Sequence, residues 1–285
     1  TNICHPSMAN NETSGLVVTT GIAKWISSLK KRKYTYRITF LPETVGAIAY
    51  IKKNLNILKK NVIAGFVLVC IGDNKSYSYL SSRSGNTLSD QAIKIGLKKS
   101  KIKKYKKYSY LDRGSDERQF CSPGVDLPFC SFMRSKYHTY SQYHTSLDNL
   151  KFISKKGLNG SLKVLKNTIK YIESKNHLLK TKKNKIKVKQ SKLKNNILNS
   201  IYIRRKNLLC EPFLSQYNLY HTLNYNYKPG LGFGFKMKQK LSGKNEKDYD
   251  TRVSSTSPLN EREINIILNI FAYIDGKINL LNLSK

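Results

Sequence analysis

Residues 62–74 read Val-Ile-Ala-Gly-Phe-Val-Leu-Val-Cys-Ile-Gly-Asp-Asn, and this stretch says most about the fold. Ten uncharged residues closed by a turn signal are typical of a strand that is covered on both faces. Apolar residues at helical spacing predict helices over residues 14–30, 44–58 and 87–99, and Tyr34–Leu41 alternates like a second strand. This succession of helices and strands predicts an α/β domain with a mostly parallel sheet, in which sites gather at strand ends.

The rest of the chain divides into an irregular segment, a helix, a lysine-rich run and a terminal unit. Residues 112–148 lose periodicity and gather Gly, Pro, Ser, Tyr and His, a composition more often functional than decorative in a long loop. A further helix is predicted over Ser161–Ser174. Residues 180–207 carry many lysines and no acidic residue, so we expect a solvated insertion or linker there. A further helix is expected over Asn260–Tyr273.

The charge of the chain is extreme for a globular protein. Its 285 residues include 52 Lys and Arg against 17 Asp and Glu, a formal net charge of +35. Nucleic-acid binding is one explanation. Compositional drift is the other, and we favour it because the lysines are spread along the chain together with abundant Asn, Ile and Tyr, the residues that AT-rich codons specify.

Membrane insertion and disulfide stapling are not expected. The apolar runs Val62–Ile71 and Ile264–Ile274 are shorter than the ~20 residues a membrane-spanning helix needs. The five cysteines are widely spread and form no Cys-x-x-Cys pair, which argues against a structural zinc ribbon and favours free thiols in a reducing compartment. These features predict a cytoplasmic protein.

Three residues stand out as candidates for chemistry. His5, at a loop that leads into a helix, is either a metal ligand or an ordinary surface histidine. Glu43 follows a proline at the end of an apolar segment, where a carboxylate acts as a general base or simply favours a helix N-terminus. His144 has Asp148 close enough in sequence to orient its imidazole.

Two further groups of charges are weaker candidates. Asp73 ends the buried strand, so its carboxylate is expected at the rim of the sheet. Residues 112–118 pack alternating charges that could bind a zwitterion or pair with one another. Neither pattern identifies a reaction on its own.

Several motifs together resemble one known family. They are His-Pro-Ser-Met-Ala-Asn-Asn-Glu-Thr-Ser-Gly at 5–15, Pro-Glu-Thr-Val-Gly-Ala-Ile-Ala-Tyr at 42–50, the Arg113–Pro128 stretch and Tyr-His-Thr-Ser-Leu-Asp at 143–148. This set resembles the bacterial aminopeptidase-like branch of the zinc exopeptidases, a family of unknown function. Residues 210–214 and 271–276 resemble the winged-helix module that ends those proteins.

The resemblance implies a three-layer α/β/α domain over residues 1–179, the lysine-rich insertion at 180–207, and a winged-helix domain over 208–285. It also implies that an N-terminal part of the domain lies outside this chain. For the terminal module the mostly apolar run after Glu263 predicts packing or dimerisation and no sequence-specific DNA binding.

The resemblance further implies roles for individual residues. His5 and His144 match metal ligands and Glu43 matches the base, whereas Asn10 and Thr44 stand where the superfamily has carboxylates. Uncharged side chains there argue for one Zn²⁺ and against two. Asp73 is the expected third ligand. The expected substrate contacts are Asn10, Glu117, Arg118 and Tyr143.

Two functions follow as hypotheses. The first is a zinc-dependent hydrolase acting on a small peptide or related amide, with Glu43 as the base for water. The second is a catalytically silent binding or regulatory protein that keeps the aminopeptidase scaffold and uses the winged helix for interactions. Retention of His5, Glu43 and His144 favours the enzyme, while Asn10 and Thr44 favour the silent protein.

Overall fold

A four-stranded sheet forms the centre of the described structure. The computed structural model describes residues 1–175 and 261–274. The strand order is β1 (Gly65–Leu68), β4 (Phe129–Met133), β2 (Ser78–Leu80) and β3 (Lys106–Tyr108). Strands β1 and β4 pair in parallel, as do β2 and β3, while β2 and β4 are antiparallel. The prediction of a mixed α/β fold with a mostly parallel sheet is confirmed.

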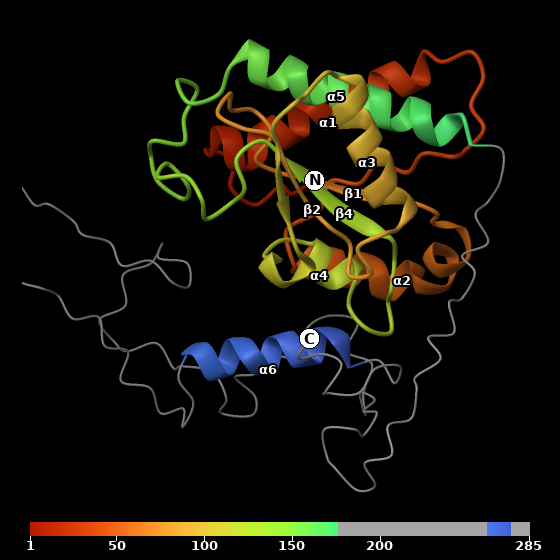
Figure 1. The fold of residues 1–285 in the computed structure, drawn as a ribbon, viewed down its shortest axis with the longest axis vertical. Coiled ribbons are helices and arrows are strands. Elements are labelled where there is room, and N and C mark those ends of the chain that lie inside the picture. Colours follow the sequence, from red (N-terminus) through yellow and green to blue (C-terminus); the bar gives the residue numbers. More distant parts are fainter. Residues whose placement is uncertain (176–260, 275–285) are drawn as a thin grey trace, which may run out of the picture. The chain divides into compact units, whose positions relative to one another are not determined.

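Helices cover both faces of this sheet (Figure 1). On one face lie α1 (Ser14–Ser27), α3 (Leu88–Lys99) and α5 (Lys155–Glu173), and on the other lie α2 (Val45–Asn61) and the short α4 (Glu117–Phe120). Each face has its own hydrophobic cluster. The expected three-layer α/β/α arrangement is therefore present.

The spacing of apolar residues explains these layers. In α1, Val18, Ile22 and Ile26 are buried at intervals of four residues, which places them on one helix face. In β1, Val67 joins the cluster under α2 whereas its neighbour Leu68 joins the cluster under α1, because successive strand side chains point to opposite faces. A strand buried on both faces has to be apolar throughout, as the sequence of β1 is.

The sequence-based strand assignment was wrong at Tyr34–Leu41. Exposure does alternate there, with residues 34 and 36 half-buried and 35 and 37 exposed, but the segment forms no strand. Its one sheet-like pairing is an isolated parallel bridge between Leu41 and Asn2. Alternation reports a half-buried extended backbone, whereas a strand also needs a neighbour to complete its hydrogen bonds.

The close contact between α3 and α5 depends on Gly96. A methyl group there would lie 2.9 Å from the carbonyl oxygen of Val164 and closer still to the Thr168 hydroxyl. We expect Gly96→Ala to destabilise the protein by about 1–3 kcal/mol, because backbone atoms of α5 would have to move. Gly21→Ala is the matched control. Its methyl group would meet only Leu162 at ordinary contact distance, so helix propensity should leave stability unchanged or up to about 1 kcal/mol higher. Urea unfolding of both variants tests this prediction. Equal unfolding midpoints for Gly96→Ala and Gly21→Ala would contradict the close packing of α3 and α5.

The described residues cover only part of the predictions for residues 180–285. Helix α6 spans Glu261–Tyr273, close to the predicted Asn260–Tyr273. The lysine-rich insertion at 180–207 and most of the predicted winged helix lie outside the described residues. Within the described ranges, no helix has the length and apolarity needed to cross a membrane.

Candidate functional site

The candidate site lies beyond the carboxyl ends of the parallel strands β1 and β4. A π-helical turn, η1 (Ala9–Thr13), precedes α1 and passes the end of β1, where the Cys70 amide donates to the Asn11 carbonyl over 3.4 Å. The bridge between Asn2 and Leu41 brings the segment around Cys4 alongside Glu43. Open α/β sheets commonly place ligands at this edge, and π-helical turns are frequent at functional sites.

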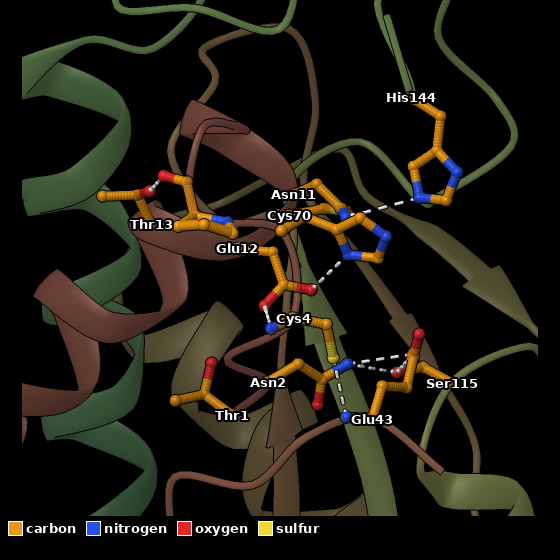
Figure 2. A network of polar contacts seen from close by, with 12 residues as sticks. Thr1, Asn2, Cys4, Asn11, Glu12, Thr13, Glu43, Cys70, Ser115 and His144 are labelled. Atoms are coloured by element: carbon orange, nitrogen blue, oxygen red, sulfur yellow. Dashed lines mark hydrogen bonds and ion pairs between the residues drawn. The ribbon is translucent and has the colours of Figure 1, made fainter. Parts of the chain in front are cut away.

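Cys4, His5 and Glu12 form one group of potential metal ligands. Their ligand atoms all lie within 4.8 Å of one another. His5 Nδ1 is 3.0 Å from Glu12 Oε1, and the Cys4 backbone amide donates to Glu12 Oε2 over 2.9 Å (Figure 2). The Glu12 side chain is 2% exposed, the His5 side chain 35%, and Cys4 is exposed. The group therefore runs from a buried carboxylate outward to solvent.

Glu43 lies directly beside this group. Its backbone amide donates to Cys4 Sγ over 2.8 Å, and its Oε1 accepts from Asn2 Nδ2 over 2.9 Å and from Ser115 Oγ over 2.6 Å (Figure 2). Burial raises the pKa of the Glu43 carboxyl, an effect that the Ser115 hydroxyl and the Arg118 charge oppose. A carboxylate with a raised pKa, held in place by two donors, has the properties of a general base.

His144 approaches His5 from the loops after β4. The two ring centroids lie 4.8 Å apart, and the His144 ring stacks on Tyr143 at 3.9 Å. His144 Nε2 is 3.5 Å from the Asn11 amide nitrogen (Figure 2). Burial, with a contribution from His5, lowers the pKa of His144, so its imidazole is neutral at neutral pH. The resemblance matched both histidines to metal ligands, and the structure brings their rings close together.

Backbone strain is concentrated around these residues. Thr44, Cys70, His138 and His144 all have positive φ, between 50° and 62°. Non-glycine residues in this region cost about 1–3 kcal/mol each, and they persist where surrounding structure fixes them, often at functional sites. Thr44 is also tied down by its amide, which donates to Asp116 Oδ1 over 2.8 Å.

Asp73 and Asn10 are structural residues, which corrects the roles expected for them. The Asp73 carboxylate is fully buried and accepts from the Ser135 amide and hydroxyl, the Lys75 amide and the Asn10 side chain. Asn10 is also fully buried, and its Oδ1 accepts from the Gly72 and Asp73 amides at 2.8 and 2.9 Å. Because these groups already have their partners, Asp73 is not placed to bind a metal and Asn10 does not face a substrate.

Glu117 is likewise internal rather than a substrate contact. It is 0% exposed, and its carboxylate accepts four hydrogen bonds, from the Gly114 and Ser115 amides and from the Tyr137 and Ser131 hydroxyls. Arg118, one residue on, is half-buried, and its Nη2 donates to Thr44 Oγ1 over 3.3 Å. Of this expected pair, only Arg118 lies where a substrate could reach it.

Asp148 does not orient His144, contrary to expectation. Its oxygens accept from the Asn10 and Asn11 backbone amides at 2.6 and 3.0 Å and so hold the start of the π-helical turn. The side-chain amide that faces His144 Nε2 is that of Asn11, one position after Asn10. Tyr143, the last expected substrate contact, is half-buried against His144 and His138.

Comparison with known proteins assigns the family. A family model described as a domain of unknown function, DUF4910, matches residues 1–175. The chain belongs to the DUF4910 family. The motif-based recognition of an aminopeptidase-like family is confirmed by its relatives. A Clostridium acetobutylicum protein, named provisionally as a polysaccharide biosynthesis protein with an aminopeptidase-like domain, is 41% identical over 169 residues, covering 59% of this chain and 38% of that protein.

A comparison with solved structures finds chains of similar fold. A crystal structure from Clostridium acetobutylicum, named provisionally as a peptidase, is 40% identical with a TM-score of 0.57 and covers 60% of this chain and 40% of that one. A zinc aminopeptidase of Bacillus subtilis is 18% identical with a TM-score of 0.47, covering 60% of this chain and 43% of that one. The latter likeness is too weak to carry an argument. The chain thus spans about two fifths of the relatives it matches.

The sequence patterns did not identify three residues of the candidate site. Glu12 lay inside the 5–15 motif, Cys4 stood next to His5, and Ser115 fell in the charged 112–118 stretch. The available signal was a thiol, an imidazole and a carboxylate within nine residues. Which of them face one another depends on the π-helical turn, which the sequence pattern did not reveal.

Proposed function

We propose that this protein is a zinc-dependent hydrolase of the aminopeptidase type, acting on a peptide or a related amide bond. The observation that carries the proposal is the 2.8 Å hydrogen bond from the Glu43 amide to Cys4 Sγ. It holds a carboxylate with the properties of a general base beside a group of thiol, imidazole and carboxylate donors. Such a pairing of base and metal ligands is what metal-assisted hydrolysis requires.

The residues present fit one zinc ion. Zn²⁺ binds sulfur, imidazole nitrogen and carboxylate oxygen, and Cys4, His5 and Glu12 supply one of each. His5 and Glu12 would hold the ion with one further donor, for which Cys4 and His144 are the available neighbours. When bound, zinc supplies a lowered pKa for water and polarises a carbonyl group. A second ion is not supported, because Asn10 and Thr44 bring no charge.

Glu43 would take a proton from the attacking water. Both of its side-chain hydrogen bonds are accepted by Oε1, from Asn2 and Ser115, and Oε2 accepts none from the described residues. The carboxylate is therefore oriented through one oxygen while the other can accept a proton. Because the pKa of Glu43 is raised, its carboxylate accepts a proton at a pH closer to neutral than an ordinary glutamate does.

Arg118 and Tyr143 would contact the substrate. The Arg118 charge acts on Glu43 and the guanidinium lies at Thr44, so it is placed to meet a carbonyl or carboxylate oxygen near the base. The Tyr143 ring stacks on His144 and offers an apolar wall on the other side. Peptides and their amides present both an oxygen and an apolar side chain.

A silent binding protein is the alternative function. The observation in its favour is that Asn10 and Thr44 are uncharged where the superfamily has carboxylates, and that the Asn10 side chain is bonded to the Gly72 and Asp73 amides. In that case the site would keep its strained backbone for a ligand that is bound and not cleaved. Metal content and turnover separate the two functions.

Metal removal and return test the proposal. The purified full chain is expected to contain about one zinc per molecule and to hydrolyse members of a library of aminoacyl amides and short peptides. A chelator should abolish hydrolysis, and stoichiometric Zn²⁺ should restore it. Zinc-free protein that cannot be loaded, or loaded protein without turnover across the library, would refute the hydrolase and favour the silent binding protein.

A further inference from the structure

We propose that Cys4, rather than His144, supplies the third protein ligand of the zinc ion, so that the ion is bound by a thiolate, an imidazole and a carboxylate. This inference rests on the proposed zinc site and names its ligands. It departs from the expected set of His5, His144 and Asp73.

Glu12 is a buried carboxylate that forms no ion pair with a lysine or arginine among the described residues. Its side chain is 2% exposed, and its only ion-pair partner among the described residues is His5, which carries a charge only when protonated. A buried carboxylate is costly unless it is paired with a cation. Because the lysines and arginines of the described residues form no ion pair with Glu12, a metal ion in contact with Glu12, His5 and Cys4 would supply the missing positive charge.

The distances already approach those of a zinc site. Ligand atoms that share a tetrahedral zinc at ~2.0–2.3 Å lie roughly 3.3–3.7 Å apart. His5 Nδ1 and Glu12 Oε1 are 3.0 Å apart, and all three ligand atoms of the group lie within 4.8 Å. Small side-chain rotations suffice to bring them round one ion. The open side is toward solvent, since Cys4 is exposed and the His5 side chain is 35% exposed.

Cys4 is held in position by hydrogen bonds to its sulfur and from its backbone amide. The Glu43 amide donates to its sulfur, and its own amide donates to Glu12 Oε2. Hydrogen bonds to a ligand atom and between neighbouring ligands fix the geometry of metal sites. On binding, the zinc–sulfur bond would form as the S–H bond breaks, and the proton would pass to solvent.

His144 is placed differently. It is not part of the group whose ligand atoms lie within 4.8 Å. Its ring stacks on Tyr143 at 3.9 Å and 14°, and its Nε2 faces the Asn11 amide. Three protein ligands leave the fourth position open, as in catalytic zinc sites, whereas a fourth ligand would close it. His144 would then stand beside the open position.

X-ray absorption at the zinc edge tests this assignment on the full chain, loaded with one Zn²⁺ under reducing conditions. We expect a sulfur neighbour at ~2.3 Å, distinct from nitrogen and oxygen at ~2.0–2.2 Å. Cys4→Ser should remove the sulfur signal and weaken zinc binding at least tenfold. His144→Ala should keep the signal, and so should Cys210→Ser, which removes the cysteine outside the described residues.

Alkylation of the wild-type chain gives a second measurement that needs no variant. Cys4 is the exposed cysteine among the described residues, so iodoacetamide should label it in the metal-free protein and zinc should protect it. Three results would each overturn the inference. They are zinc bound to the wild-type chain without a sulfur neighbour, a sulfur signal that persists in Cys4→Ser, and equal labelling of Cys4 with and without zinc. Hydrolysis by a zinc site without sulfur would leave the proposed function standing, whereas a sulfur-ligated zinc without turnover would remove the function alone.

Discussion

Replacing Glu43 by glutamine is expected to lower the rate of amide hydrolysis about 10²- to 10⁴-fold while zinc stays bound. Glutamine keeps the shape of the side chain, and its Oε1 can still accept from Asn2 Nδ2 and Ser115 Oγ. It cannot take a proton from water at neutral pH. The variant therefore removes the base and leaves both the fold and the neighbouring Cys4, His5 and Glu12 in place.

The measurement is kcat on the best amide of the library, together with zinc content and thermal unfolding. Asp126→Asn is the matched control, because it makes the same acid-to-amide change at an exposed residue that pairs with Arg83. Asparagine also tolerates the positive φ of that position. The control should keep wild-type rates. A Glu43→Gln protein that turns over as fast as wild type would mean that another group serves as the base.

The layers of the fold could be predicted from the sequence because local patterns carry them. The uncharged run that contains β1 indicated a strand covered on both faces, and helical spacing located α1, α2 and α3 within a few residues. Strand β4 was missed. Its five residues Phe129–Met133 sit within the irregular 112–148 segment, and only pairing with β1 and β2 makes them the centre of the sheet.

The site residues likewise differ in whether a local sequence pattern or a long-range contact determines their role. His5, Glu43 and His144 were singled out because each lies in a motif that resembles the aminopeptidase-like family, and the structure places His5 near His144 and Glu43 next to Cys4. Asp73 was misassigned because its carboxylate turns to Ser135, a contact between residues 62 positions apart that no local pattern indicates. Glu12 was overlooked for the opposite reason. A π-helical turn has a wider spacing than an α-helical one, so the sequence did not show which of its residues would face His5.

Glu117→Ala should be the most destabilising of the single substitutions considered for this protein. The four groups that donate to the carboxylate would lose their acceptor inside the protein: the Gly114 and Ser115 amides and the Tyr137 and Ser131 hydroxyls. An unsatisfied buried donor costs about 1–3 kcal/mol. Even with partial relaxation the sum is on the order of 4 kcal/mol, a large share of the roughly 5–15 kcal/mol that holds a domain folded.

Glu117→Gln separates this argument from a general intolerance of the site. Glutamine Oε1 can keep the hydrogen bonds from Gly114, Ser115 and Tyr137, while its amide nitrogen can donate to Ser131 Oγ in place of the acceptor lost there. We expect its urea midpoint to stay close to that of the wild type, while the alanine variant unfolds at a much lower urea concentration or fails to fold. Since Ser115 also donates to Glu43, loss of the Glu117 acceptor should disturb the base as well. An alanine variant as stable as the glutamine variant would show that water or a side-chain shift satisfies these donors, and that Glu117 does not hold the loop that orients Glu43.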